Sequence, residues 1–354
     1  MERSQSSGAP RQARYGYLDW LRIAAAFGII VLHMTPLASL EVKVSSPAWT
    51  VMNVCSNSLR ASVALFFMIS GALFLDPQKP VTAQKLFKKT IPRMLISFFF
   101  WSAIYAVAHC LLYGLGKWAF LNQLFRGHYH MWYIFTITSL YLITPILRRV
   151  TESKKLTEYL LVSGFVLTFV CARVLGFIQL FNLPHADVVA SVQSFYAQIN
   201  PYRGLYFVLY FVLGHYLHAY PVGEKLRRLA APVFILCAAI TCALCGWNSR
   251  MLGETSSYFS DLSSLNVFGM AVSLFVLFQT HCDRTSPALQ RLSKGTYGIY
   301  LVHAFVIERL SLNFSAQPLA LFAQIALGSC AVFLISAAVS AILGRIPVLN
   351  RYIV

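Results

Sequence analysis

Charged side chains are scarce in this 354-residue chain, at 12% of the sequence, and acidic ones are the scarcest, with 12 Asp and Glu against 29 Lys and Arg. Hydrophobic residues make up 58%, and the mean hydropathy is +0.63. Soluble domains usually have about a quarter of their residues charged. So few charges cannot cover a surface in water, so the composition excludes a soluble globular protein and a disordered one. It predicts an integral membrane protein.

A disulfide framework and a metal-binding cysteine pattern are also missing. Nearly all of the eight cysteines lie inside apolar runs. Cys242 and Cys245 form a C-x-x-C, but no second pair and no nearby histidine accompanies them. We therefore expect small buried hydrophobic side chains, no metal site, and no disulfide-stapled secreted fold.

The apolar runs predict an all-α polytopic fold, because a helix needs about 20 residues to cross the hydrocarbon layer. About ten spans are expected, at 17–36, 50–75, 92–114, 131–149, 159–179, 203–220, 229–247, 262–281, 296–313 and 318–343. Prolines and glycines mark several expected helix ends: Pro36, Pro77, Gly114, Pro221 and Gly344.

The chain is expected to consist of an N-terminal tail (1–16), one transmembrane domain (17–343) and a C-terminal tail (344–354). We see no internal repeat and no appended soluble domain. Asp19 and Arg22 interrupt the first apolar run, which argues against a cleavable signal peptide.

The net charge of +17 could suggest a nucleic-acid partner, but its distribution argues against one. Twenty basic residues fall in the tails and in alternate loops, whereas the other loops hold Lys43, Lys117, Arg126 and Arg250. Such a bias orients a membrane protein with its basic side inward. Both termini are therefore predicted to be cytoplasmic, in the inner membrane of a bacterium.

Polar residues within the spans are the candidates for function, because a charge at mid-membrane costs roughly 3 kcal/mol or more. The first span contains Asp19, Arg22 and His33. Arg22 and His33 are eleven residues apart, which places them on one helix face about 16 Å apart. Asp19 and Arg22 could instead be a structural ion pair, and His33 a core histidine.

Further candidates lie in the second and third spans. Arg60 needs an internal partner or a watery cavity, while Ser70 and Gly71 offer a small surface for a ligand or for tight helix packing. Lys89 and Arg93 are one turn apart at the expected cytoplasmic end of the third span. They could orient the protein or bind lipid head groups, but Arg93 could also bind a phosphate.

Histidines occur again near the fourth and ninth spans. His128 and His130 precede the fourth span, and His303 lies in the ninth, followed by Glu308. Singly, each histidine is more often structural. Together, His33, His130 and His303 could meet in a polar interior whose cytoplasmic mouth carries Arg22 and Arg93.

Four of these segments resemble, in order, the motifs of the acyltransferase-3 family of integral-membrane acyltransferases. YLDWLRIAAAFGIIVLH resembles the family's Asp-x-x-Arg…His helix, and FFMISGALFL its Phe-Phe-x-x-Ser-Gly element. HMWYIFTITSLYLITPILRR resembles its His-x-Trp-aromatic helix, and SKGTYGIYLVH its Gly-Ile-Tyr-Leu-x-His helix. A chain without an extracytoplasmic domain is similar to the branch that acetylates enterobacterial common antigen.

The resemblance implies transfer of an acyl group from cytoplasmic acyl-CoA, commonly acetyl-CoA, to a hydroxyl of a cell-surface or lipid-linked saccharide. It implies a catalytic role for His33 and a donor-binding role for Lys89 and Arg93. The family often has two arginines followed by proline, whereas this chain has Lys89 and places Pro92 before Arg93.

Physical considerations favour the same chemistry. The pantetheine arm of CoA is about 20 Å long, which would let the thioester reach His33 from a basic mouth. His33 could act as a general base or as an acyl carrier, with Ser70, His130 or Arg60 as donors to the oxyanion. Asp19 is a further catalytic candidate. Arg22 and His303 complete the expected donor site.

The sequence leaves several alternatives open. A succinyl donor is possible, because nothing in the sequence reads the acyl chain. A transporter for a polyprenol-linked sugar would also place charges along an internal pathway, and a non-catalytic scaffold is a third class. The loop 180–202 is the expected place for acceptor specificity, and membrane lipids are the other expected partners.

Overall fold

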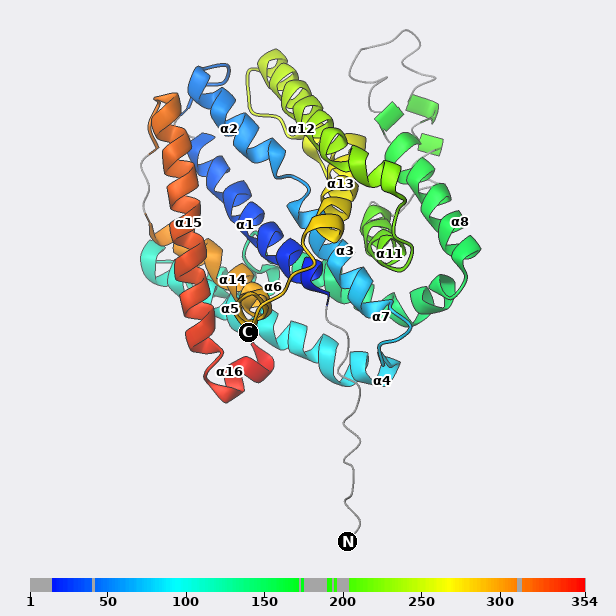
Figure 1. Ribbon diagram of the computed structural model, residues 1–354. Helices are drawn as coiled ribbons and strands as arrows, with labels where there is room; N and C mark the ends of the chain where they lie inside the picture. Colours follow the sequence, from blue (N-terminus) through cyan, green and yellow to red (C-terminus); the bar gives the residue numbers. More distant parts are fainter. Residues whose placement is uncertain are drawn as a thin grey trace.

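The computed structural model describes residues 15–39, 42–171, 173–174, 190–192, 194–195, 204–310 and 314–353. All of the secondary structure in these ranges is helical (Figure 1), which confirms the predicted all-α class. The helices are α1 (Gly16–Ser39), α2 (Pro47–Ser58), α3 (Ser62–Phe74), α4 (Ala83–Lys85), η1 (Leu86–Thr90), α5 (Ile91–Tyr113), α6 (Lys117–Arg126), α7 (Trp132–Thr151), α8 (Lys154–Phe165), η2 (Val166–Cys171), α11 (Leu205–Ala219), α12 (Glu224–Leu252), η3 (Tyr258–Ser260), α13 (Leu265–His281), α14 (Pro287–Arg309), α15 (Pro318–Leu343) and α16 (Pro347–Tyr352).

Six helical segments among the described residues are long and apolar enough to cross a membrane. They are Gly16–Leu37, Pro47–Phe74, Ala83–Tyr113, Glu224–Leu252, Tyr258–His281 and Pro318–Leu343. Several leave most of their apolar surface uncovered: only 28% of the most apolar 18-residue stretch of α12 is buried against other helices. Lipid is the environment that covers such a surface, so this is a multi-pass membrane protein.

The remaining expected spans also fall on helices, but these are shorter or more polar: α7, α8 with η2, α11 and α14. The total of ten spans and the side of the termini stay predictions. The described part of the fifth span begins earlier than expected, at Lys154. The loop 180–202, where we expected acceptor specificity, lies almost entirely outside the described residues.

The first two spans differ from their predicted shapes. The expected end at Pro36 is wrong, because α1 continues to Ser39 with this proline inside its last turns. The predicted helix 50–75 is two helices, α2 and α3, separated by a turn at residues 59–61. Arg60 lies in this turn and donates from Nε to Ser260 Oγ at 3.1 Å. A turn there lets the side chain reach a polar partner in η3 rather than lipid.

Helix α1 is at the centre of the bundle, where it contacts α2, α3, α13, α14 and α15. Helix α3 packs closely on α11 through glycines: a Cβ at Gly71 would overlap the Phe211 carbonyl, and one at Gly214 would overlap the Met68 carbonyl. The tight packing expected for Gly71 is confirmed. Its neighbour Ser70 lies about 100° away around α3 and is half-buried.

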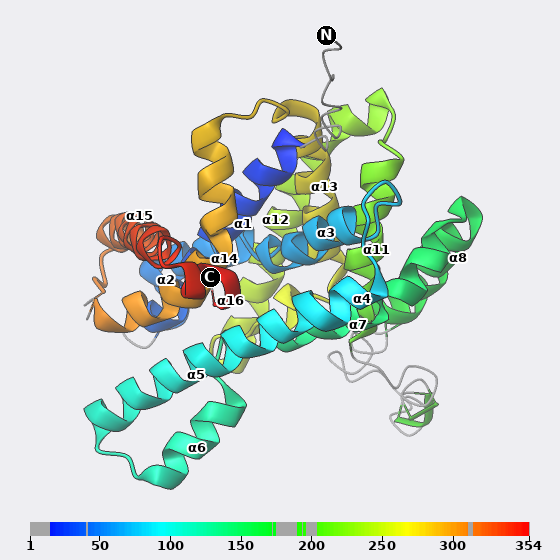
Figure 2. The same cartoon turned by 90° about the horizontal axis from the view of Figure 1, so that it is seen from below.

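A π-helical segment, η1, leads into α5 and carries Lys89. Pro92 lacks the N–H that would bond to the carbonyl four residues earlier, and the wider turn occurs just before it. Beyond this point α5 is continuous to Tyr113, where Gly114 ends it in the left-handed conformation. Helices α5 and α6 form a hairpin that extends outward from the other helices (Figure 2).

Candidate active site

A cavity of about 430 Å³ lies between α1, α3, α5, α7 and α14. From α1 it is lined by Arg22, Ile29 and His33, which are spaced by whole numbers of turns and therefore lie on one face. The shared face predicted for Arg22 and His33 is thus confirmed. The cavity has two chemically different ends, one basic and one rich in histidine.

The basic end is formed by five cations: Lys85, Lys89 and Arg93 from the continuous helical segment Ala83–Tyr113, Arg22 from α1, and Lys294 from α14. Lys85 and Lys89 are exposed. Arg93 is half-buried and donates from Nη2 to the Asn350 carbonyl at 3.4 Å. So many cations with no carboxylate among the described lining residues attract an anion strongly.

Hydroxyl groups line the walls between the two ends. Tyr133, Tyr141, Tyr297 and Tyr300 contribute from α7 and α14, and Ser70 from α3. The Tyr297 hydroxyl donates to Ser97 Oγ at 3.0 Å, and the Tyr300 hydroxyl to the His130 carbonyl at 2.7 Å. These bonds fix the aromatic rings, so the walls are amphipathic and rigid.

At the other end, His33 is bonded to His303. Nδ1 of His33 and Nε2 of His303 are 2.7 Å apart, and Nδ1 of His303 is 2.6 Å from the Tyr300 carbonyl. A carbonyl only accepts, so His303 donates from Nδ1 and, when neutral, accepts at Nε2. His33 therefore donates from Nδ1. This leaves the lone pair of His33 Nε2 for chemistry.

His130 completes the histidine end. Its ring centroid is 5.0 Å from that of His303 and 6.3 Å from that of His33. The predicted convergence of the three histidines is therefore confirmed, although their roles stay predictions. Burial lowers the pKa of the His130 imidazole well below its usual value, and the nearby His303 and His128 lower it further. His130 is thus held as a neutral imidazole.

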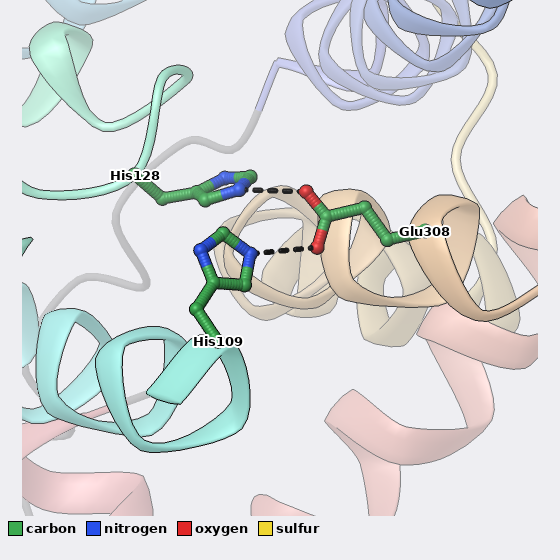
Figure 3. A group of neighbouring side chains, drawn as sticks. All are labelled: His109, His128 and Glu308. Atoms are coloured by element: carbon green, nitrogen blue, oxygen red, sulfur yellow. Dashed lines mark hydrogen bonds and ion pairs between the residues drawn. The ribbon is translucent and has the colours of Figure 1, made fainter. Parts of the chain in front are cut away.

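A second group of polar residues adjoins His130 (Figure 3). Nδ1 of His128 is 3.0 Å from Nδ1 of His130, and Nε2 of His128 is 2.8 Å from Oε1 of Glu308. His109, on α5, approaches Oε2 of the same carboxylate at 3.3 Å. The donor atoms of His109, His128 and Glu308 lie within 4.8 Å of one another, a spacing that could hold a metal ion.

These three residues line a second cavity, of about 930 Å³, whose other wall is formed by α6. Its lining combines aromatic rings with amide and charged groups, including Trp118, Asn122, Gln123, Arg126 and Trp132. Trp132 lines both cavities. The histidine end of the first cavity therefore adjoins the second.

Three predicted site residues, Asp19, Arg60 and His303, are not among the described residues that line the first cavity. Asp19 is buried and accepts from Ser293 Oγ at 2.6 Å, which ties α1 to α14. Arg60 is directed toward η3 instead. His303 is hydrogen-bonded to a lining residue, His33. The other six candidates line the cavity: Arg22, His33, Ser70, Lys89, Arg93 and His130.

Sequence reasoning missed several residues of the site. The four tyrosines gave no signal, because aromatic residues are common in apolar helices. His109 lies near the end of an apolar run, and Glu308 is a carboxylate in an expected span. The position of a polar side chain within an apolar segment was the signal that could have identified both residues. Their meeting depends on the α5–α6 hairpin, which the sequence pattern does not predict.

Comparison with known proteins adds one finding. A family model described as an acyltransferase domain, of the acyltransferase-3 type, matches residues 15–341. No curated protein and no solved structure matches the chain in the other two comparisons. The match covers almost all of the described helices and both ends of the cavity.

Proposed function

Because the chain belongs to the acyltransferase-3 family and is a membrane acyltransferase, we propose that it transfers an acyl group from acyl-CoA to a saccharide hydroxyl. Acetyl-CoA is the simplest donor, with succinyl-CoA as an alternative. The acceptor is a cell-surface or lipid-linked glycan, as in the branch that acetylates enterobacterial common antigen. We place the protein in a bacterial inner membrane with its basic end in the cytosol.

One observation carries this proposal: a single cavity joins five cations to His33. The phosphates of CoA fit the basic end, where arginine and lysine bind them by charge-assisted hydrogen bonds. The pantetheine arm, about 20 Å long, then extends along the tyrosine-lined walls. Its thioester ends near His33, and the acceptor enters from the second cavity.

Transfer follows from the lone pair on His33 Nε2. As a general base, it takes the proton of the acceptor hydroxyl while the oxygen attacks the thioester carbonyl. The carbon–sulfur bond then breaks, and the imidazolium returns the proton to the CoA thiolate. As an acyl carrier, the same nitrogen attacks the thioester first, the carbon–sulfur bond breaks to release the CoA thiolate, and the hydroxyl then takes the acyl group from His33. Ser70, on the cavity wall, is the proposed donor to the oxyanion.

The transporter interpretation has no support from the family match. The broken helix α2–α3 is a feature that transporters use, but its turn binds Ser260 through Arg60 and contributes no described residue to the cavity. An acyltransferase explains the same polar residues by their chemistry.

Thermal unfolding of the purified protein in detergent tests the donor site. Acetyl-CoA at a hundred times its dissociation constant stabilises a reversible fold by about 2.7 kcal/mol, so we expect a rise in Tm that free CoA competes away. Dephospho-CoA, which lacks the 3′-phosphate, is the matched control and should shift Tm less. No shift with millimolar acetyl-CoA, in protein shown to be folded, would contradict the proposal.

A further inference from the structure

We propose that, when His33 carries the acyl group, Glu308 and His128 are positioning residues that hold His130 as the acceptor of the hydroxyl proton. The inference rests on the proposed function and assigns a role to the polar group of Figure 3. His130 touches the reacting hydroxyl in this scheme, whereas His128 and Glu308 act through it.

The tautomers follow from the hydrogen bonds, beginning at Glu308. Its carboxylate only accepts, so the contact of 2.8 Å requires His128 to donate from Nε2. A neutral His128 then accepts at Nδ1, and His130 donates to it from its own Nδ1 across 3.0 Å. The lone pair of His130 therefore lies on Nε2.

That nitrogen is buried and has no hydrogen-bond partner among the described residues. A buried acceptor without a partner is unfavourable, so Nε2 of His130 is suited to a donor that arrives with the substrate. His130 lines the first cavity and His128 the second. A hydroxyl that enters between the cavities would meet this nitrogen.

The Glu308 carboxylate also balances the positive charge that forms when His130 is protonated. When His130 takes the acceptor proton at Nε2, the imidazolium can pass its Nδ1 proton to His128, whose Nε2–H faces Glu308. The positive charge is then paired with a carboxylate. Oε1 serves this chain, while Oε2 contacts His109 at 3.3 Å and Arg309 at 3.9 Å. The hydroxyl oxygen attacks the acyl carbon, the bond to His33 Nε2 breaks, and the proton returns through His130 to the CoA thiolate released in the first step, so the reaction balances without another reactant.

The ring of His128 is held in place for this role. It stacks on Tyr105 with centroids 4.2 Å apart and an interplanar angle of 12°. The Tyr105 hydroxyl in turn donates to the Leu301 carbonyl at 2.9 Å and accepts from the Phe305 N–H at 3.0 Å. Helix α14 thus positions both the carboxylate and, through Tyr105, the imidazole that bonds to it.

The test measures CoA release from acetyl-CoA by the protein in lipid nanodiscs, with a saccharide extract of the source organism's cell envelope as acceptor. Glu308→Gln removes the negative charge, and His128→Phe keeps a ring on Tyr105 without its nitrogens. We expect kcat to fall about a hundredfold in each variant, with the KM for acetyl-CoA unchanged. The double variant should lose no more than either single one, because both residues act in one chain.

Arg309→Gln is the matched control, since Arg309 contacts the same carboxylate at 3.9 Å but, among the described residues, is not part of the lining of either cavity. Its kcat should stay within a few-fold of wild type. If His109→Gln loses as much kcat as Glu308→Gln and His128→Phe, and a chelator inactivates wild type until Zn²⁺ is restored, then His109, His128 and Glu308 are metal ligands and the proposal is wrong.

Other outcomes are equally clear. Folded Glu308→Gln and His128→Phe proteins that bind acetyl-CoA and turn over at the wild-type rate would overturn the inference alone. A wild-type protein that neither binds nor consumes acetyl-CoA would instead overturn the proposed function.

Discussion

The two ends of the cavity hold their functional side chains in opposite ways. At the basic end, Lys85 and Lys89 are exposed, and the cations come from α1, α14 and the segment Ala83–Tyr113. At the histidine end, His130 and His303 are buried, and His33 is bonded to His303 at 2.7 Å. Charge attraction acts over several ångströms and tolerates loose geometry, whereas proton transfer requires contact at hydrogen-bond distance.

This comparison predicts that changes at the histidine end reduce turnover, while changes at the basic end reduce donor affinity. The largest effect should come from His33→Ala, because it removes the nitrogen that meets the reacting atoms. We expect acyl transfer to fall by at least about a thousandfold, with the Kd for acetyl-CoA close to wild type. Calorimetric titration and transfer of radiolabelled acetyl groups measure the two quantities. Wild-type transfer by this variant would refute the role of His33.

His303→Phe should have the second largest effect. The ring volume is kept, but His33 loses the acceptor that fixes its tautomer, so Nε2 is no longer held as the base. We expect kcat to fall about tenfold to a hundredfold. Equal kcat in the variant and wild type, with the protein still folded, would show that the 2.7 Å contact does not position His33.

Arg93→Ala tests the opposite end. Loss of one phosphate contact should weaken acetyl-CoA binding by about tenfold, with kcat at saturating donor unchanged. The difference in affinity between this variant and wild type should shrink as salt is added, because salt screens the attraction between Arg93 and the phosphate. A variant that binds like wild type at low salt would separate Arg93 from the donor site.

The smallest effect should come from Lys89→Ala, since its side chain is exposed. We expect binding to weaken about twofold to fivefold, as for a surface ion pair. Lys88→Ala is the matched control, because Lys88 is the adjacent cation of η1 but is not among the described residues that line the first cavity. Equal losses in the two variants would mean that η1 acts through its general charge rather than through a contact with the donor.

The sequence predicted much of the site, and the reason is visible in α1. Arg22 and His33 share a face because a helix repeats every 3.6 residues, and both line the cavity. Conversely, the helix predicted at 50–75 is divided by the turn at Arg60, whose side chain bonds to Ser260, about 200 residues away. Hydropathy alone contains no information about that contact.

Composition and local pattern by themselves determined that the chain is helical, that it belongs in a membrane, and which polar residues are exceptional there, since burial in lipid penalises charge wherever it occurs. Only the tertiary structure decided which helix faces meet. It brought His109 of α5, His128 of the turn between α6 and α7, and Glu308 of α14 together, and it left Asp19 and Arg60 out of the cavity lining. The helical repeat sets the direction in which a side chain points around the axis of its helix. The packing of that helix against others decides which residues the side chain contacts.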